Sequence, residues 1–168
     1  MTRRAIALKW LLYALTAAVA VLLQNLILTP LHIGGVHPFL LPAAAVIPAT
    51  REARGQSLLF AFTFGLLCDL TMPASFPCLY AAAFSLSALL SGIVARRLIN
   101  PGAICSVAAS TAALIVTDLL QLLSMAGSGT TDVLTGLVLT LHELAVSVVF
   151  FFPVHFLDYW VYRRTLSE

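Results

Sequence analysis

Two carboxylates, Asp118 and Glu143, stand inside apolar runs of the chain, and His142 directly precedes Glu143. An ionised carboxylate in the middle of a membrane helix costs at least about 2.5 kcal/mol, so such a residue needs a reason. One interpretation is a polar site between two helices that relays protons or binds a ligand. The other is a neutral, hydrogen-bonded tie between helices, which we favour because no lysine or arginine lies at matching depth.

Asp69 lies near the C-terminal end of a predicted helix, where the helix dipole disfavours an anion. We therefore expect either a hydrogen-bond donor from a neighbouring element or contact with water at the membrane edge. Asp158 and Glu168 fall close to the C-terminus, and the sequence favours solvated charges there.

The histidines lack the spacing of a metal site. His32 and His37 lie on a predicted loop, and Val146 stands where an H-E-x-x-H motif that began at His142 would need its second histidine. No G-x-S-x-G motif or glycine-rich phosphate loop occurs in the sequence. We therefore expect no enzymatic activity, no metal and no cofactor. The formal net charge of +2 is too small to favour a nucleic-acid partner.

The composition indicates that lipid is the main solvent of this protein. Apolar residues make up 61% of the 168 residues and charged residues only 10%. Because one span needs about 20 apolar residues, a chain of this length holds roughly six spans and no second domain. We predict an all-α membrane protein in which residues 1–168 form one domain with six transmembrane helices. The six apolar segments are 10–29, 38–48, 56–71, 78–94, 102–125 and, with Asp132 as its N-cap, 133–162.

The second apolar segment differs from the others because it is too short to span comfortably and contains Pro38, Pro42 and Pro48. Proline removes backbone donors that lipid cannot replace. We therefore expect a broken helix that faces other helices rather than lipid. Pro153 predicts a kink in the last helix.

The basic residues determine the predicted orientation. They form four clusters, at the two ends of the chain and in the turns after the second and fourth segments: Arg3, Arg4, Lys9, Arg51, Arg54, Arg96, Arg97, Arg163 and Arg164. With six spans all four clusters fall on one side of the membrane, which the positive-inside rule identifies as the cytoplasm. Both termini are therefore predicted to be cytoplasmic.

Small residues recur at helical spacing on two of the predicted helices. One stripe consists of Ala81, Ser85, Ala88 and Gly92, and a second consists of Ala14 and Ala18. Small side chains let helix backbones approach closely. Each stripe could accept the transmembrane helix of a partner or serve packing within the protein, and we favour internal packing for both.

Several short motifs, in this order along the chain, resemble the rod shape-determining protein MreD family of bacterial inner-membrane proteins. They are Leu22-Leu23-Gln24, Pro38, Arg51 to Gly55, Gly65-Leu66-Leu67-Cys68-Asp69, Asp118, Pro153 and Arg163-Arg164. The resemblance covers nearly the whole chain. The chain departs from the family ahead of Gly65, where Leu59, Ala61 and Phe62 replace the usual glycines.

The resemblance implies a six-helix fold similar to the substrate-binding subunits of energy-coupling-factor vitamin transporters. It also implies a non-catalytic role in the inner membrane: binding the single-span protein MreC within the complex that directs lateral peptidoglycan synthesis and rod shape. The filament protein MreB and the wall polymerase and transpeptidase would be additional partners. The alternative is a substrate-capture subunit of a vitamin transporter, in which Asp118, His142 and Glu143 would line a pocket.

Overall fold

The structure is a computed structural model that describes residues 3–72, 77–97, 102–127 and 133–166. Every regular element in these ranges is helical, so the predicted all-α class is confirmed. The elements are α1 (Arg3–Leu23), a π-helical turn η1 (Gln24–Leu28), α2 (Leu41–Val46), a 3₁₀ turn η2 (Ile47–Thr50), α3 (Arg54–Thr71), α4 (Leu79–Arg97), α5 (Ala103–Gly127) and α6 (Val133–Leu166). Each apolar segment of the sequence thus contains one α-helix. The predicted N-cap Asp132 and the residue Glu168 lie outside the described residues.

Three stretches are long and apolar enough to cross a membrane: Ile6–Leu28, Ala103–Ser124 and Leu134–Arg163. Leu41–Thr50 and Leu79–Ala95 are shorter apolar helices. Large apolar side chains cover the outside of the bundle, and Leu70 and Ile104 are 83% and 79% exposed. Water does not tolerate such a surface over a whole molecule. The architecture is therefore that of a helical membrane protein.

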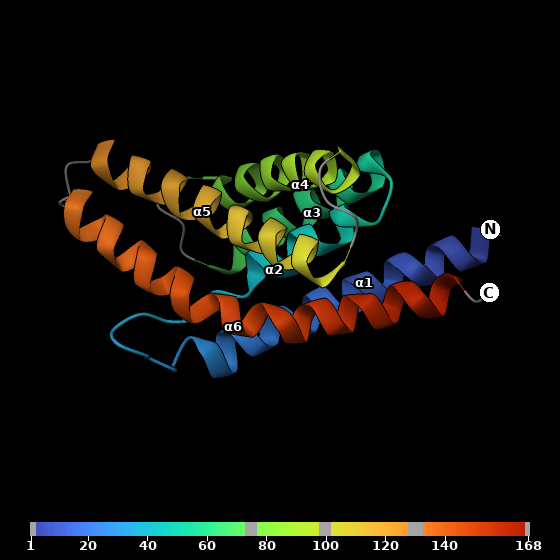
Figure 1. Cartoon of the computed structure of the whole chain (residues 1–168), viewed down its shortest axis with the longest axis horizontal. Coiled ribbons are helices and arrows are strands. Elements are labelled where there is room, and N and C mark those ends of the chain that lie inside the picture. The colour runs from blue at the N-terminus through green and yellow to red at the C-terminus, as the bar shows by residue number, and fades with distance from the viewer. Residues whose placement is uncertain (1–2, 73–76, 98–101, 128–132, 167–168) are drawn as a thin grey trace.

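The helices form an elongated bundle around α2 (Figure 1). α1 and α6 run side by side and carry both termini at the same end of the molecule. α3 packs against α4, and α5 bridges α4 and α6. α6 contains Pro153 and is visibly bent, as the missing proline N–H predicts.

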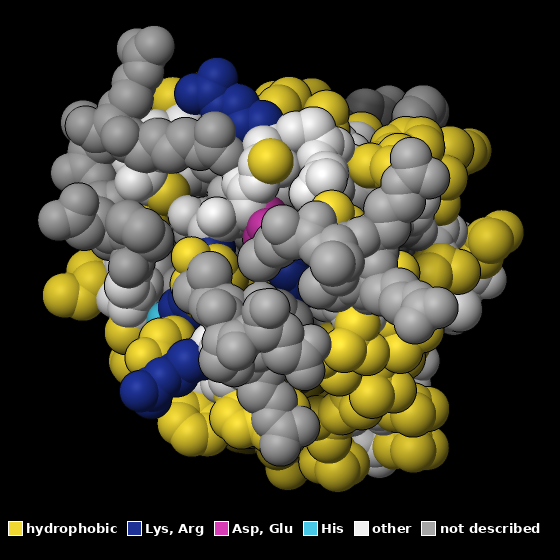
Figure 2. Space-filling model, turned by 90° about the vertical axis from the view of Figure 1, so that its right-hand side faces the viewer, with side chains coloured by type: hydrophobic (Ala, Val, Ile, Leu, Met, Phe, Trp, Pro, Cys, Tyr) yellow, Lys and Arg dark blue, Asp and Glu magenta, His cyan; other side chains and the backbone are white. Residues whose placement is uncertain are grey.

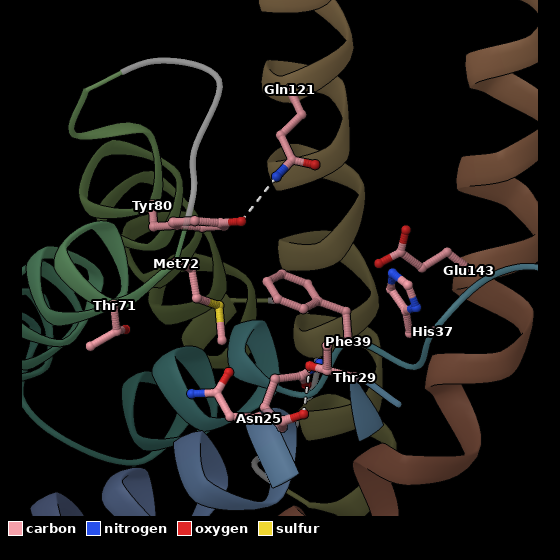
Figure 3. A pocket seen from close by; sticks show the side chains of 10 residues that line it. Asn25, Thr29, His37, Phe39, Thr71, Met72, Tyr80, Gln121 and Glu143 are labelled. Atoms are coloured by element: carbon pink, nitrogen blue, oxygen red, sulfur yellow. Dashed lines mark hydrogen bonds between the residues drawn. The ribbon is translucent and has the colours of Figure 1, made fainter. Parts of the chain in front are cut away.

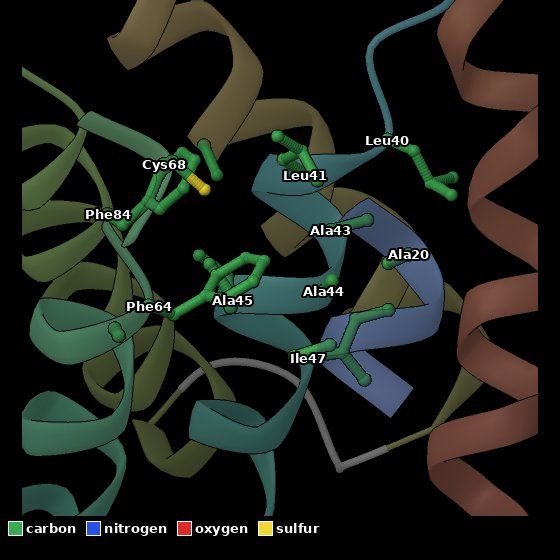
Figure 4. Close-up of a cluster of buried hydrophobic side chains, with 14 of the residues drawn as sticks. Ala20, Leu40, Leu41, Ala43, Ala44, Ala45, Ile47, Phe64, Cys68 and Phe84 are labelled. Atoms are coloured by element: carbon green, nitrogen blue, oxygen red, sulfur yellow. The ribbon is translucent and has the colours of Figure 1, made fainter. Parts of the chain in front are cut away.

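The short α2 occupies the centre of the core. All residues from Leu40 to Thr50 are buried, and Figure 4 shows α2 enclosed by side chains such as Ala20, Phe64 and Phe84. The expectation that this proline-containing segment faces other helices is confirmed. A helix of six residues is too short to span lipid, but it is stable here because protein surrounds it.

The described lysine and arginine side chains gather at the end that carries the termini, as Figure 2 shows. Contacts place them together: Lys9 pairs with Glu52, and the Arg51 guanidinium lies 5.1 Å from the ring centroid of Tyr159. The beginning of α1, the turn after η2 and the end of α6 therefore meet. The side chains of Arg3, Arg4, Arg96, Arg97 and Arg164 lie outside the described part of the chain.

Candidate functional site

Gln24 connects α1 to the start of the broken second segment. Its side-chain amide donates to the Pro38 carbonyl at 3.0 Å, and its side-chain oxygen accepts from the Leu40 N–H at 2.8 Å. The Phe39 N–H between them donates to the Ser147 hydroxyl of α6 at 2.8 Å. Three successive backbone groups that no helix satisfies thus find partners on η1 and α6, as an apolar surrounding requires.

The π-helical turn orients Gln24. The Gln24 carbonyl accepts from the Thr29 N–H and from the Thr29 hydroxyl, each at 2.8 Å. A π-turn widens the helix locally and often occurs at functional positions. The Gln24 side chain is only 3% exposed and faces the bundle.

Gly65 and Asp69 connect α3 to α4. We call the contacts of Gln24 the first joint of the bundle and those of Gly65 and Asp69 the second joint. Gly65 and Asp69 lie one turn apart on one face of α3. A Cβ added at Gly65 would lie 2.5 Å from the Ala81 Cα, so the two backbones approach too closely for any side chain. One turn on, the two Asp69 oxygens accept from the N–H groups of Tyr80 and Ala81, each at 3.0 Å.

Asp69 therefore acts as an N-terminal cap supplied by a neighbouring helix. The first N–H groups of a helix have no partner within it, and the positive end of the helix dipole favours an anion. This explains how a carboxylate is stabilised near the C-terminal end of its own helix. Of the two alternatives that the sequence left open for Asp69, the structure shows the hydrogen-bond donor, which consists of two backbone amides.

Replacing Asp69 by asparagine should destabilise the protein by about 1.5–3 kcal/mol, the usual contribution of a hydrogen bond to a charged group. The asparagine oxygen can accept from one amide, but its NH₂ group would oppose the other. Thermal unfolding of purified protein should give the order Asp69, Asp69→Asn, Asp69→Ala from most to least stable. Equal stability of all three proteins would show that the cap contributes nothing.

The small-residue stripe on α4, which begins at Ala81 and ends at Gly92, packs inside the protein. Ala81 contacts Gly65, Ala88 is 2% exposed, and a Cβ at Gly92 would lie 3.4 Å from the Ala49 carbonyl oxygen. Ser85 is partly buried. The stripe therefore packs against α3 and η2, as favoured from the sequence, and does not form an open face for another helix.

A charged cluster lies at the end that carries the termini. The Lys9 ammonium is 2.6 Å from the Glu52 carboxylate, and the Tyr13 hydroxyl donates to the same carboxylate at 3.3 Å. The guanidinium of Arg51 also lies over the ring of Tyr162, at 5.4 Å. The cluster therefore brings α1 into contact with the turn after η2, and removing one partner would leave an uncompensated buried charge.

The interpretation of Asp158 as a solvated charge is wrong. Its side chain is 2% exposed, and Thr16 donates to one carboxylate oxygen at 3.4 Å. The other oxygen is buried without a hydrogen-bond partner. The helix periodicity turns Asp158 toward α1, which covers it, and this contact between the two ends of the chain cannot be seen in local sequence.

A polar cavity of about 340 Å³ lies at the opposite end of the bundle (Figure 3). Residues of η1, α3, α4, α5 and α6 line it, together with residues of the loop between η1 and α2. The polar lining includes Gln24, Thr29, His37, Tyr80, Gln121 and Glu143. Gln121 donates to the Tyr80 hydroxyl at 3.1 Å across the cavity. Both structural joints border this space, through Gln24 and through Tyr80.

Of the residues that the sequence grouped as one intramembrane site, the structure places Glu143 in the lining of a cavity but not Asp118 or His142. Glu143 lines the cavity, whereas Asp118 is 5% exposed and lies one helical turn deeper on α5 than Gln121. His142 is exposed and covers Gly34, because a Cβ at Gly34 would lie 2.6 Å from its Nε2. The expectation that His142 shares a pocket with Glu143 is therefore wrong, and His37 is the histidine at the cavity.

Among the described residues, no three histidine, cysteine, aspartate or glutamate side chains are arranged to hold a metal ion. The rings of His32 and His37 contact each other edge to face, with centroids 4.8 Å apart. Of the other motif residues, Gly55 is exposed with open space around it, so nothing in the structure explains a glycine there.

An apolar groove of about 470 Å³ runs between α1 and α3. Its lining includes Ala14, Ala18, Val21, Phe60, Thr63 and Leu67. Ala14 and Ala18 are exposed, so this second small-residue stripe faces a free surface, contrary to the internal packing favoured for it. A smaller apolar groove of about 310 Å³ lies between α4 and α5, so among the described residues the α1–α3 groove is the larger of these two.

The chain matches no protein-family model, no curated protein and no solved structure.

Proposed function

We propose that the protein is a non-catalytic subunit of the bacterial rod and elongation complex and binds the transmembrane helix of MreC in the α1–α3 groove. The groove carries this proposal. It is apolar, it is open on the lipid side of the bundle, and small residues on α1 leave room for a second backbone. In this role the protein supports lateral peptidoglycan synthesis, with MreB and the wall polymerase and transpeptidase as further partners.

The proposal includes six spans in the bacterial inner membrane with both termini in the cytoplasm. The clustering of described basic side chains at the end that carries the termini supports this orientation. The motif residues that carry the resemblance support the fold of such a subunit. Gln24 meets Pro38, and Gly65 and Asp69 meet α4, so these residues stabilise a rigid body rather than perform chemistry.

Filling the groove tests the docking role. The double substitution Ala14→Leu/Ala18→Leu should reduce recovery of MreC from native membranes by about tenfold or more, because bulky side chains prevent close approach of helices. The matched control is Ala108→Leu/Ala112→Leu on α5, where the same spacing of exposed alanines lies outside the groove. Equal recovery with both double variants would refute docking in this groove, and no recovery of MreC by the unaltered protein would refute the scaffold role.

A second candidate is a substrate-capture subunit of a vitamin-type transporter, and the polar cavity favours it. The cavity lies within the usual size range of small-molecule sites and opens at the end opposite the basic cluster. Specific binding stabilises a folded protein by mass action. A vitamin that raises the thermal unfolding temperature in proportion to its concentration would support capture, and no response across a vitamin panel would contradict it.

A further inference from the structure

Among the described residues that line the polar cavity, Glu143 alone has a formally charged side chain, and its carboxylate lies beside the imidazole of His37. Asp118 lies about one helical turn deeper on α5 than Gln121 and is 5% exposed. One oxygen of Asp118 is buried without any hydrogen-bond partner. The cavity and the region beneath it therefore favour positive charge.

The protein supplies no lysine or arginine to this region within its described part. Lys9, Arg51, Arg54 and Arg163 belong to the other end of the bundle, where α1 begins and α6 ends. Within the described residues, neither carboxyl group therefore has a lysine or arginine as its counter-ion. A ligand that brings a cation to the cavity would meet no lysine or arginine side chain there.

Aromatic rings form a wall of the same cavity. The rings of Phe39 and Tyr80 lie 6.0 Å apart at 44°, and Figure 3 shows both facing the central space. Gln121 holds the Tyr80 hydroxyl, which orients the ring. The faces of aromatic rings attract ammonium groups, and the attraction grows where water is excluded. Met72 adds a flexible apolar contact.

We propose that this cavity binds the ammonium group of a small organic cation, with Glu143 as its counter-ion and Phe39 and Tyr80 as its aromatic contacts. The amides of Asn25 and Gln121 supply hydrogen bonds to a polar neighbour of the ammonium group. A volume of about 340 Å³ fits a small amine or the headgroup of an amine-bearing lipid. The proposal depends on the cavity alone, so failure of the helix-docking role would leave it intact.

The test measures thermal unfolding of the full chain in detergent with added ethanolamine or choline. Ethylene glycol is the neutral control and acetate the anionic control. We expect the two amines to raise the unfolding temperature with saturation and the two controls to have no such effect. Equal stabilisation by ethylene glycol, or no stabilisation by any amine in solution or in lipid, would overturn the proposal.

Lipid nanodiscs distinguish the two sources of the ammonium group. If the ligand is a lipid headgroup, the protein should unfold at a higher temperature in discs of phosphatidylethanolamine than in discs of phosphatidylglycerol. Stabilisation by free ethanolamine with no preference between the discs would identify a soluble amine. Either result supports an ammonium site, and neither depends on MreC.

Two substitutions assign the contacts. Glu143→Gln should weaken amine binding about tenfold or more, because it removes the charge and keeps the shape. Phe39→Leu should weaken it by a smaller factor through loss of the aromatic face. The unfolding temperature without ligand shows whether each variant is folded. Unchanged amine affinity in a folded Glu143→Gln protein would exclude Glu143 as the counter-ion and overturn the site as described.

Discussion

Substitution of Gln24 by leucine should lower the free energy of unfolding by about 2–6 kcal/mol. Two backbone groups, the Pro38 carbonyl and the Leu40 N–H, depend on this one side chain. Each buried group left without a partner costs about 1–3 kcal/mol. Leucine fills a similar volume, so the loss would reflect hydrogen bonding rather than a cavity.

The matched control is Gln56→Leu. Gln56 is exposed near the start of α3, so the same chemical change there leaves no buried backbone group unsatisfied and should alter stability by less than about 0.5 kcal/mol. Both variants would be compared with the parent protein by thermal or denaturant unfolding in one detergent. Similar losses of unfolding free energy for Gln24→Leu and Gln56→Leu would show that the hydrogen bonds of Gln24 do not stabilise the apolar segment that contains α2.

Substitution of Gly65 by alanine should lower the free energy of unfolding by about 2.5–6 kcal/mol. The added Cβ would lie 2.5 Å from the Ala81 Cα and 2.7 Å from the Tyr80 carbonyl oxygen, and backbone atoms cannot move aside as a flexible side chain can. Overpacking alone costs about 1–3 kcal/mol. The shift of α4 would also lengthen the hydrogen bonds to Asp69, which adds about 1.5–3 kcal/mol.

Gly55→Ala provides the control for this change. Gly55 lies in the first turn of the same helix and has open space where a Cβ would be added. Alanine is the better helix former, so Gly55→Ala should stabilise the protein by about 0.5–1 kcal/mol. The opposite signs of the two glycine substitutions, measured as unfolding temperatures, are the expected result.

A double-mutant cycle tests whether Gly65 and Asp69 act together. If close approach at Gly65 is what brings the α4 amides to Asp69, the costs of Gly65→Ala and Asp69→Asn should be less than additive in the double variant. Strict additivity would mean that the glycine and the carboxylate stabilise α4 independently.

The two joints also shape the cavity. Gln24 fixes one side of it and Tyr80, which the Asp69 cap holds in place, fixes another. A rigid wall allows a polar site to bind a ligand without ordering side chains, which would weaken binding. The residues that carry the family resemblance therefore stabilise the body of the protein and, through it, the geometry at both candidate surfaces.

The sequence alone determined the number of helices, their approximate ends and the burial of the second segment. These features follow from local quantities: the length of apolar runs, the positions of prolines and the cost of unsatisfied backbone groups in lipid. The prediction that Asp69 needs either a donor or contact with water came from the same local reasoning, because the helix dipole is a property of its own helix.

Only the tertiary structure decided which polar residues meet. Two whole apolar segments lie between Lys9 and Glu52 in the sequence, and Asp158 is covered by α1 from the other end of the chain. Within α6, Glu143 and Ser147 are one turn apart and face the bundle, a spacing that could have indicated Ser147 from the sequence.

His142 and Glu143, which are adjacent in the sequence, also show that local sequence does not determine which residues share a site. Adjacent residues of a helix point in directions about 100° apart, so their closeness in sequence did not place them in one site. Helix packing then brought His37, from a loop distant in sequence, to the cavity beside Glu143. Local physics thus specified the helices, and long-range packing, which no short motif encodes, specified the sites.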